Sequence, residues 1–271
     1  MNQQLPDLAE ALPRLIFEKS PGPSLSDSVN EIFRLGSSER NYISRDTWRS
    51  IWQLHESFDA EKEDFELSSI SSMADQLVTH LTALSGFIND SMTRNEVFRF
   101  LEIGRRLERA IQISGMLKSF FIPLPNRAAA VFETALEVAD SLMTYRSRYF
   151  ANLQLAPVLD LLVVDESNPR SLGYQLVMLA EHVALLSGQN SPGLKTADQQ
   201  RFAMALLHSV RMIQLGTVAQ CHALDDYEPM ENLINHWNRQ LADLHTAISN
   251  RYFVHAKSQQ QVTDYPIFNP E

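Results

Sequence analysis

The segment from Arg94 to Lys118 gathers charged side chains in a pattern that could bind an anion. It carries six positive and three negative charges in a chain whose formal net charge is −10. At about 100° per residue along a helix, four of these residues share one narrow sector and two flank it. The four are Arg99, Glu102, Arg106 and Arg109, and the two are Arg105 and Glu108.

Two interpretations of this charged sector are open. In the first, the sector faces water, and Glu102–Arg106 and Arg105–Glu108 form ordinary ion pairs one helical turn apart. In the second, the arginines are partly buried and bind a carboxylate, a phosphate or an acidic protein segment, because guanidinium is a rigid bidentate donor.

The opposite side of the same segment is apolar and predicts a buried face. Its members are Phe100, Ile103, Gly104, Leu107, Ala110 and Ile111. Glycine costs about 1 kcal/mol relative to alanine inside a helix. We therefore expect another helix to approach closely at Gly104.

A second segment, residues 140–149, carries two tyrosines and two arginines. Tyr145 and Tyr149 fall on an apolar stripe, so we expect core tyrosines with hydrogen-bonded hydroxyls. The other members of the stripe are Val131, Ala135, Val138 and Leu142. Arg146 and Arg148 point away from it, and they would join the first arginine cluster if the two helices are neighbours.

A third segment, residues 165–171, combines an acid, a cap and a base. Asn168 followed by Pro169 predicts a helix start, with the asparagine as N-cap. Helix N-termini favour anions, and Arg170 adds a positive charge there. Asp165 supplies a carboxylate. An ordinary capped loop is the alternative interpretation.

Helices must position all of these residues. Apolar residues recur at intervals of three and four between sparse glycines and prolines, which predicts an all-α, antiparallel multi-helix bundle without a sheet. We expect about eight or nine helices, at 5–18, 25–35, 45–58, 64–90, 93–121, 127–152, 169–187, 197–224 and 228–254. The run 158–164 is more typical of a buried helix or a connector than of a strand. We expect one helical domain over 1–257 and a flexible tail over 258–271.

Composition and missing motifs narrow the function classes. An acidic chain is a poor nucleic-acid binder and a poor ligand for anionic membranes, so we expect neither as a partner. With one cysteine and no Glu-x-x-His or His-x-x-x-His pair, we expect no metal. Glycine-rich phosphate loops and nucleophile elbows are missing, so we assign no cofactor and no catalytic residue. No signal peptide or membrane-spanning run is visible, and we expect a cytoplasmic protein.

Four stretches together resemble the alpha-E domain family. They are SSERNYISRDTWRSIW (37–52), RFLEIGRRLERA (99–110), ADSLMTYRSRYFANLQLAPVLDLLVVDESNPRSLGYQL (139–176) and ISNRYFVHA (248–256). The resemblance runs from about residue 10 to residue 256. The helix with which that family usually opens has no counterpart here, so we expect the first family helix to be missing.

The resemblance implies a helical domain that works beside, or fused to, a circularly permuted ATP-grasp protein in peptide or amide-bond formation. It also implies that the pattern of Arg99, Arg105, Arg106, Glu108 and Arg109 has a role beyond solvation. We favour a non-catalytic accessory module that docks on the ligase or presents a peptide or an acidic small molecule. One alternative is an independent enzyme with Glu102, Glu108 or Asp165 as base, and the other is a purely structural scaffold.

Overall fold

The computed structural model describes residues 8–18, 22–60, 67–122, 128–149, 152–188 and 198–253. Within these ranges the chain forms twelve α-helices, a 3₁₀ turn, a π-helical turn and no strand. The all-α class is confirmed, whereas the predicted count of eight or nine helices is too low. By its internal contacts the chain divides into two compact units, Met1–Phe98 and Arg99–Glu271.

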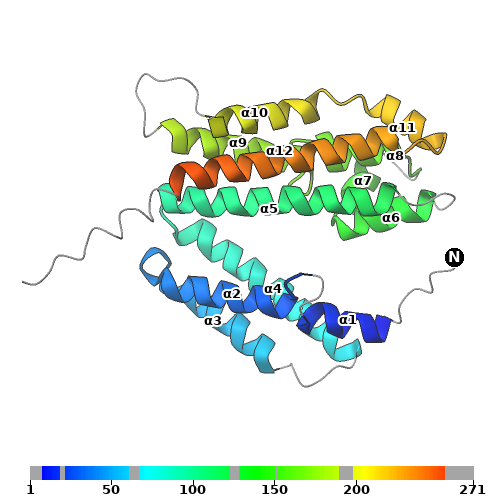
Figure 1. The fold of residues 1–271 in the computed structure, drawn as a ribbon. Coiled ribbons are helices and arrows are strands. Elements are labelled where there is room, and N and C mark those ends of the chain that lie inside the picture. Colours follow the sequence, from blue (N-terminus) through cyan, green and yellow to red (C-terminus); the bar gives the residue numbers. More distant parts are fainter. Residues whose placement is uncertain are drawn as a thin grey trace, which may run out of the picture. The chain divides into compact units, whose positions relative to one another are not determined.

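Within the described residues, the first unit holds four helices and a short 3₁₀ turn, and Figure 1 labels the helices. They are α1 (Leu8–Phe17), α2 (Leu25–Ser38), η1 (Arg40–Tyr42), α3 (Arg45–Ala60) and α4 (Leu67–Ser91). A capping box starts α2, because the Ser24 hydroxyl accepts from the Asp27 amide at 3.1 Å and the Asp27 carboxylate accepts from the Ser24 amide at 3.0 Å. Leu54, Phe58 and Met73 belong to its buried apolar core.

The second unit contains the segments that sequence analysis singled out. Its elements are α5 (Glu96–Phe121, which begins at the boundary), α6 (Ala128–Val138), α7 (Leu142–Tyr149), α8 (Leu155–Leu159), the π turn η2 (Asp160–Val164), α9 (Leu172–Gly188), α10 (Asp198–Arg211), α11 (Leu215–Ala223) and α12 (Glu228–Tyr252).

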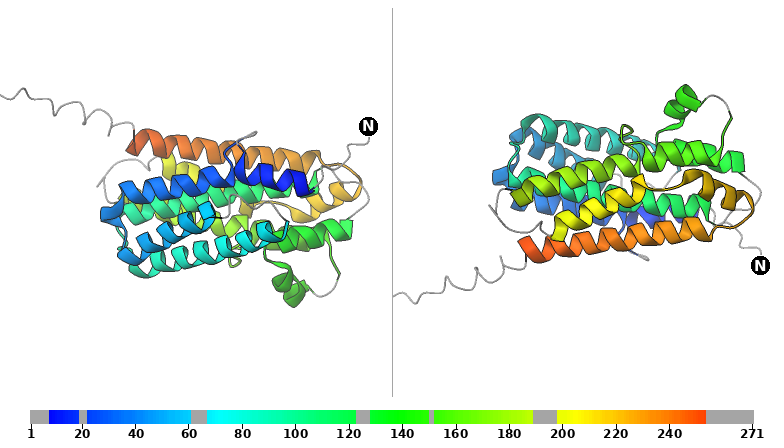
Figure 2. Two further views of the ribbon diagram at one scale, coloured as in Figure 1. Left: turned by 90° about the horizontal axis from the view of Figure 1, so that it is seen from below. Right: turned by 90° about the horizontal axis from the view of Figure 1, so that it is seen from above.

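The four long helices of this unit, α5, α9, α10 and α12, run side by side (Figures 1 and 2). The rings of Phe100 and Tyr252 meet at 5.2 Å, and Lys118 Nζ donates to Asn235 Oδ1 at 3.3 Å. The start of α5 therefore contacts the end of α12, so these helices are antiparallel, as predicted. The core between the helices includes the fully buried Trp237 and Tyr145.

The predicted helix over 127–152 is wrong, because the chain breaks between α6 and α7. Asp140 has a φ of 50°, in the left-handed region. The Ser141 amide donates to the Leu136 carbonyl at 2.8 Å, and the Asp140 amide donates to the Glu137 carbonyl at 2.9 Å. These two bonds form a Schellman motif, which ends α6 and leaves Val138 63% exposed instead of in the predicted stripe.

Two other boundaries differ from the predicted ones. The predicted helix over 197–224 is divided into α10 and α11, which are bent by 60° relative to each other. Residues 155–164 are helical, as one of the two interpretations of that run expected. The helix predicted to start at Pro169 starts at Leu172, because Ser171 caps it by accepting from the Tyr174 amide at 3.0 Å. The predicted tail, 258–271, lies outside the described residues.

Within the described residues, no single helix combines the length and the apolar composition needed to cross a membrane. Taken together, α10 and α11 reach that threshold by length and composition only. Much of their apolar surface, including Leu206 and Val210, is buried in the core of the second unit.

Candidate anion-binding site

Glu102 is the centre of the charged face of α5, and it is buried. Its side chain is only 3% exposed. Oε1 accepts a hydrogen bond from Arg105 Nη1 at 2.6 Å, and Oε2 accepts one from Arg106 Nη2 at 2.7 Å. The water-facing interpretation is therefore wrong for Glu102, and Arg105, which the spacing could also pair with Glu108, is an ion-pair partner of this carboxylate.

Helix α9 covers this ion network. Arg106 Nη1 donates to Gln175 Oε1 at 3.3 Å, and the fully buried Gln175 donates from Nε2 to the Pro169 carbonyl at 2.5 Å. The Arg106 guanidinium also lies 5.7 Å from the ring centre of Tyr174. The first turns of α9 thus hold Arg106 in one orientation.

Burial affects the pKa values of Glu102 and of the nearby His182. It raises the pKa of Glu102, but the charges and hydrogen bonds of Arg105 and Arg106 outweigh it, so the pKa is lowered overall. Burial lowers the pKa of His182, on the facing side of α9, although the Glu102 charge opposes that shift. Glu102 is therefore a charged carboxylate at neutral pH.

Arg109 occupies the same face of α5 but makes no hydrogen bond or ion pair with any described residue. Burial lowers its pKa, and the positive charges of Arg170, Arg105 and Arg106 lower it further. Arg170 lies in the loop before α9, and its Nη2 donates to Asp140 Oδ2 at 2.8 Å. The two guanidinium groups thus repel each other, and only Arg170 has a described acidic partner.

Arg109 and Arg170 line a pocket of about 280 Å³. Its other lining residues are Gln112, Ile113, Met116, Val138 and Ala139. Among the described residues, therefore, the pocket combines two arginines and one amide with apolar walls, and no carboxylate lines it. Such a site attracts an anion and offers it bidentate donors.

A family model described as "a predicted alpha-helical domain with a conserved ER motif" matches residues 1–253. The chain belongs to the Alpha-E family. Two Glu-Arg pairs occur in it, at 39–40 and at 108–109, and the second contains Arg109 of the pocket. Whether the family's first helix is missing stays a prediction.

Two relatives of this Alpha-E chain are the uncharacterized proteins Rv2567 of Mycobacterium tuberculosis and Mb2597 of Mycobacterium bovis. Each is 29% identical over 178 residues, which cover 63% of this chain and 20% of the relative. The matched part thus spans about a fifth of the length of these relatives. No solved structure matches the chain significantly.

Two of the predicted arginines in the Alpha-E chain lie outside the cluster. Arg146 Nη2 donates to Glu133 Oε1 at 2.8 Å. Arg148 pairs with Asp165 and also donates to Ser167 Oγ at 3.2 Å. Burial raises the pKa of Asp165, but the hydrogen bonds from Ser167 and Arg148 outweigh this and lower it. The Arg148 contacts hold the loop before α9 to α7, and the Arg146 contact joins α7 to α6.

Asn168 braces that same loop and does not cap α9. The side chain is buried, and its Nδ2 donates to the Leu161 carbonyl at 3.0 Å and to Ser141 Oγ at 3.3 Å. Its Oδ1 accepts from the Arg170 amide at 3.1 Å. Asn168 therefore positions Arg170 through the backbone, and the prediction that it caps a helix start is wrong.

Both tyrosines of α7 have bonded hydroxyls, as predicted. Tyr145 is fully buried, and its hydroxyl donates to the Asn152 carbonyl at 2.9 Å. Tyr149 is half-buried and donates to Asp160 in the π turn. Burial and the Asp160 carboxylate raise the pKa of Tyr149 to about 12. These contacts anchor α7 to the segment before α8 and to the π turn.

The predicted close approach at Gly104 is wrong. A Cβ atom placed there would have no described atom within 4 Å outside the backbone of its own helix. Gly104 instead lines a groove of about 680 Å³ between α5 and α12, together with Glu108, Ile111 and Gly115. The neighbouring residues Glu108 and Arg109 thus face different surface hollows.

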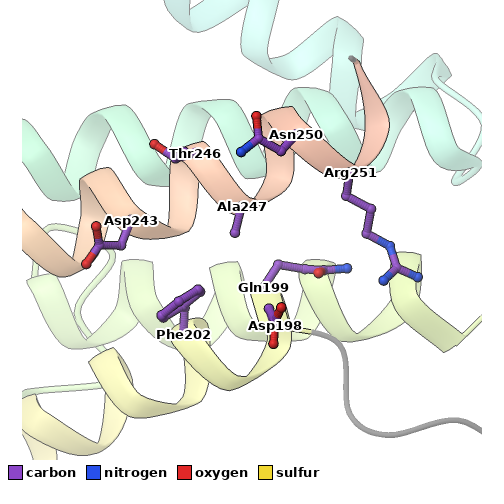
Figure 3. Close-up of a pocket in the computed structure, with 8 residues that line it drawn as sticks. All are labelled: Asp198, Gln199, Phe202, Asp243, Thr246, Ala247, Asn250 and Arg251. Atoms are coloured by element: carbon purple, nitrogen blue, oxygen red, sulfur yellow. The ribbon is translucent and has the colours of Figure 1, made fainter. Parts of the chain in front are cut away.

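Another groove, of about 630 Å³, lies between α10 and α12 (Figure 3). Asp198 and Phe202 come from α10, and Asp243 and Arg251 come from α12. None of the predicted site residues lines it. The described residues also hold no group of three side chains suited to bind a metal.

Sequence analysis missed two residues that complete the arginine site. Gln175 bonds Arg106, and Asp140 bonds Arg170. Nothing in the helical period marks Gln175, because its importance depends on how α9 packs on α5. The Asp140 turn carries no glycine or proline, which are the usual signals of a helix end.

Proposed function

We propose that this chain is a non-catalytic helical module of an ATP-grasp-type ligase system that forms peptide or other amide bonds. Its arginine-rich face holds an acidic or peptidic substrate, or docks on the circularly permuted ATP-grasp protein. The ligase context rests on the family resemblance. The observation that carries the proposal is Arg109, which lines a pocket together with Arg170, and no carboxylate is among the described residues that line it. We place this activity in the cytoplasm.

The same geometry favours binding over independent catalysis. A general base needs a carboxylate that is free to accept a proton near the substrate. Glu102 is held by two arginines, and Asp165 is held by Arg148 and Ser167. Glu108 accepts a hydrogen bond from Gln112 Nε2 at 3.3 Å and lines the other groove. Each base considered for an enzyme is therefore engaged or turned away from the arginine pocket.

Size-exclusion chromatography with light scattering tests the proposal. The chain is run alone and then with the ATP-grasp protein encoded beside it, and we expect the two to elute as one complex. The complex is then assayed for ligation with the Arg109→Gln/Arg170→Gln double variant, which we expect to reduce ligation at least tenfold. Arg201→Gln, which removes an exposed charge that pairs with Asp198, is the matched control.

Two results would contradict the proposal. One is a folded chain that elutes separately from the ATP-grasp protein at every concentration tried. The other is a double variant that binds and supports ligation like the parent chain. A double variant that lowers thermal stability and changes nothing else would favour the scaffold alternative.

A further inference from the structure

The arginine pocket has the composition of a site for a carboxylate that carries an apolar group. Four of its lining residues, Arg109, Gln112, Ile113 and Met116, are spaced three, four and seven apart and so share one face of α5. Ile113 and Ala139 are buried and form apolar walls next to the guanidinium groups. A ligand that fills this pocket meets two guanidinium groups, one amide and apolar side chains.

The size of the pocket restricts the ligand. Its 280 Å³ lies just below the range of roughly 300–1,000 Å³ that is typical of small-molecule sites. Since a water molecule takes about 30 Å³ in the liquid, the space can hold a group of about the size of one residue. The end of a peptide is such a group, because its α-carboxylate lies next to the last side chain.

A carboxylate already binds at the edge of this site. Asp140, whose side chain is 77% exposed, accepts from Arg170 at 2.8 Å. Asp140 pairs with Arg170, and Glu102 pairs with Arg105 and Arg106. Arg109 therefore has no acidic partner among the described residues. Arg170 is therefore oriented for a carboxylate, and a ligand can share or displace the exposed Asp140 pair at small cost.

We propose that the pocket binds the C-terminal carboxylate of a peptide that ends in an apolar residue, with Arg109 and Arg170 as its donors. This inference rests on the proposed function, because it names the substrate group that the module holds. Asp140 is a built-in competitor that occupies Arg170 when the peptide is absent.

Isothermal titration calorimetry of the full chain tests this assignment with four probes. They are acetyl-Ala-Leu, its C-terminal amide, acetyl-Ala-Glu-amide and inorganic phosphate. We expect acetyl-Ala-Leu to bind with one-to-one stoichiometry and the other three to bind at least tenfold more weakly. Equal binding of the Leu amide would show that the carboxylate is not required, and equal binding of the Glu amide would show that the carboxylate need not be at the chain end. Equal binding of phosphate would show that the apolar walls do not contribute. Each of these results would overturn the assignment.

Variants connect the binding to the two arginines. We expect Arg109→Gln and Arg170→Gln each to weaken acetyl-Ala-Leu at least tenfold, and the control Arg201→Gln to leave it unchanged. Asp140→Asn keeps a residue type that tolerates the left-handed conformation and removes the competing charge, so we expect binding to tighten severalfold. Unchanged binding in Arg109→Gln would overturn the assignment.

Folding is measured separately from binding. Because Arg109 is surrounded by positive charges, Arg109→Gln should keep or raise the melting temperature, so lost binding in this variant is not lost structure. The two proposals also fail separately. A chain that forms the ligase complex but ignores every peptide overturns the inference alone, and a chain that binds acetyl-Ala-Leu but never meets the ligase overturns only the proposed function.

Discussion

Replacing Glu102 with glutamine should destabilise the second unit strongly. The Glu102 side chain is 3% exposed, and its partners Arg105 and Arg106 are 33% and 19% exposed. Removing one member of a buried pair costs roughly 3–5 kcal/mol. Glutamine keeps one acceptor oxygen and water reaches Arg105, so we expect about 2–4 kcal/mol. At roughly 2–4 °C per kcal/mol for a unit of this size, the melting temperature should fall by about 5–15 °C.

Circular dichroism during thermal unfolding measures this effect, with Glu108→Gln as a matched control. Both variants remove one negative charge from α5, but Glu108 is exposed, and its substitution should stay within about 0.5 kcal/mol. Equal melting temperatures for the two variants would refute the buried network.

The dependence on pH gives an independent check of the same reasoning. Folding lowers the pKa of Glu102 from its ordinary value of 4.5, so its contribution to stability is present above that value. The contribution is lost as the pH falls through the lowered pKa. The stability difference between the parent chain and Glu102→Gln should therefore shrink below pH 4.5, and a difference that stays constant down to pH 2 would contradict this account.

Three further predictions concern positions around the site. Gly173→Ala should lower the melting temperature, because its Cβ would lie 2.8 Å from the Val164 carbonyl oxygen, a contact that costs about 1–3 kcal/mol of stability. The control Gly115→Ala has open space around it and should raise the stability by up to about 1 kcal/mol. A Gly173→Ala variant that is more stable than Gly115→Ala would refute the contact. Asn168→Ala should cost about 2–3 kcal/mol in chemical denaturation, since it removes three hydrogen bonds of a buried side chain, and a loss under 0.5 kcal/mol would contradict the bracing role. The difference in ultraviolet titration between the parent chain and Tyr149→Phe should show one phenol that ionises near pH 12. Because folding raises this pKa, the contribution of Tyr149 to stability is fully present below pH 10 and is lost as the pH rises toward 12. Ionisation of this phenol near pH 10 would be inconsistent with the Asp160 bond.

Helix periodicity predicted α5 almost to its ends, because its apolar face keeps the helical period over 26 residues. It failed at Asp140, where an ordinary acidic residue takes the left-handed conformation that usually marks glycine. It also missed the bend after Arg211, which likewise has no proline or glycine directly at the break. Local sequence propensity does not predict a helix end that is stabilised by tertiary contacts.

The candidate site was only partly visible in the sequence for the same reason. Spacing placed Glu102 and Arg106 one turn apart, and they do pair. It did not show that α9 buries them, nor that Arg170, 61 positions after Arg109, lines the same pocket. Burial of a charged face depends on the helix that covers it, and that information lies in the packing of α9.

At position 140 the backbone conformation and the contact with Arg170 favour different residue types. Glycine would suit the backbone better, because a left-handed conformation costs other residues about 1–2 kcal/mol. Glycine would also remove the carboxylate that accepts from Arg170. A substitution that makes this helix end more stable therefore leaves a second arginine without an acidic partner among the described residues, so a gain in thermostability at this position would also increase the charge repulsion in the pocket.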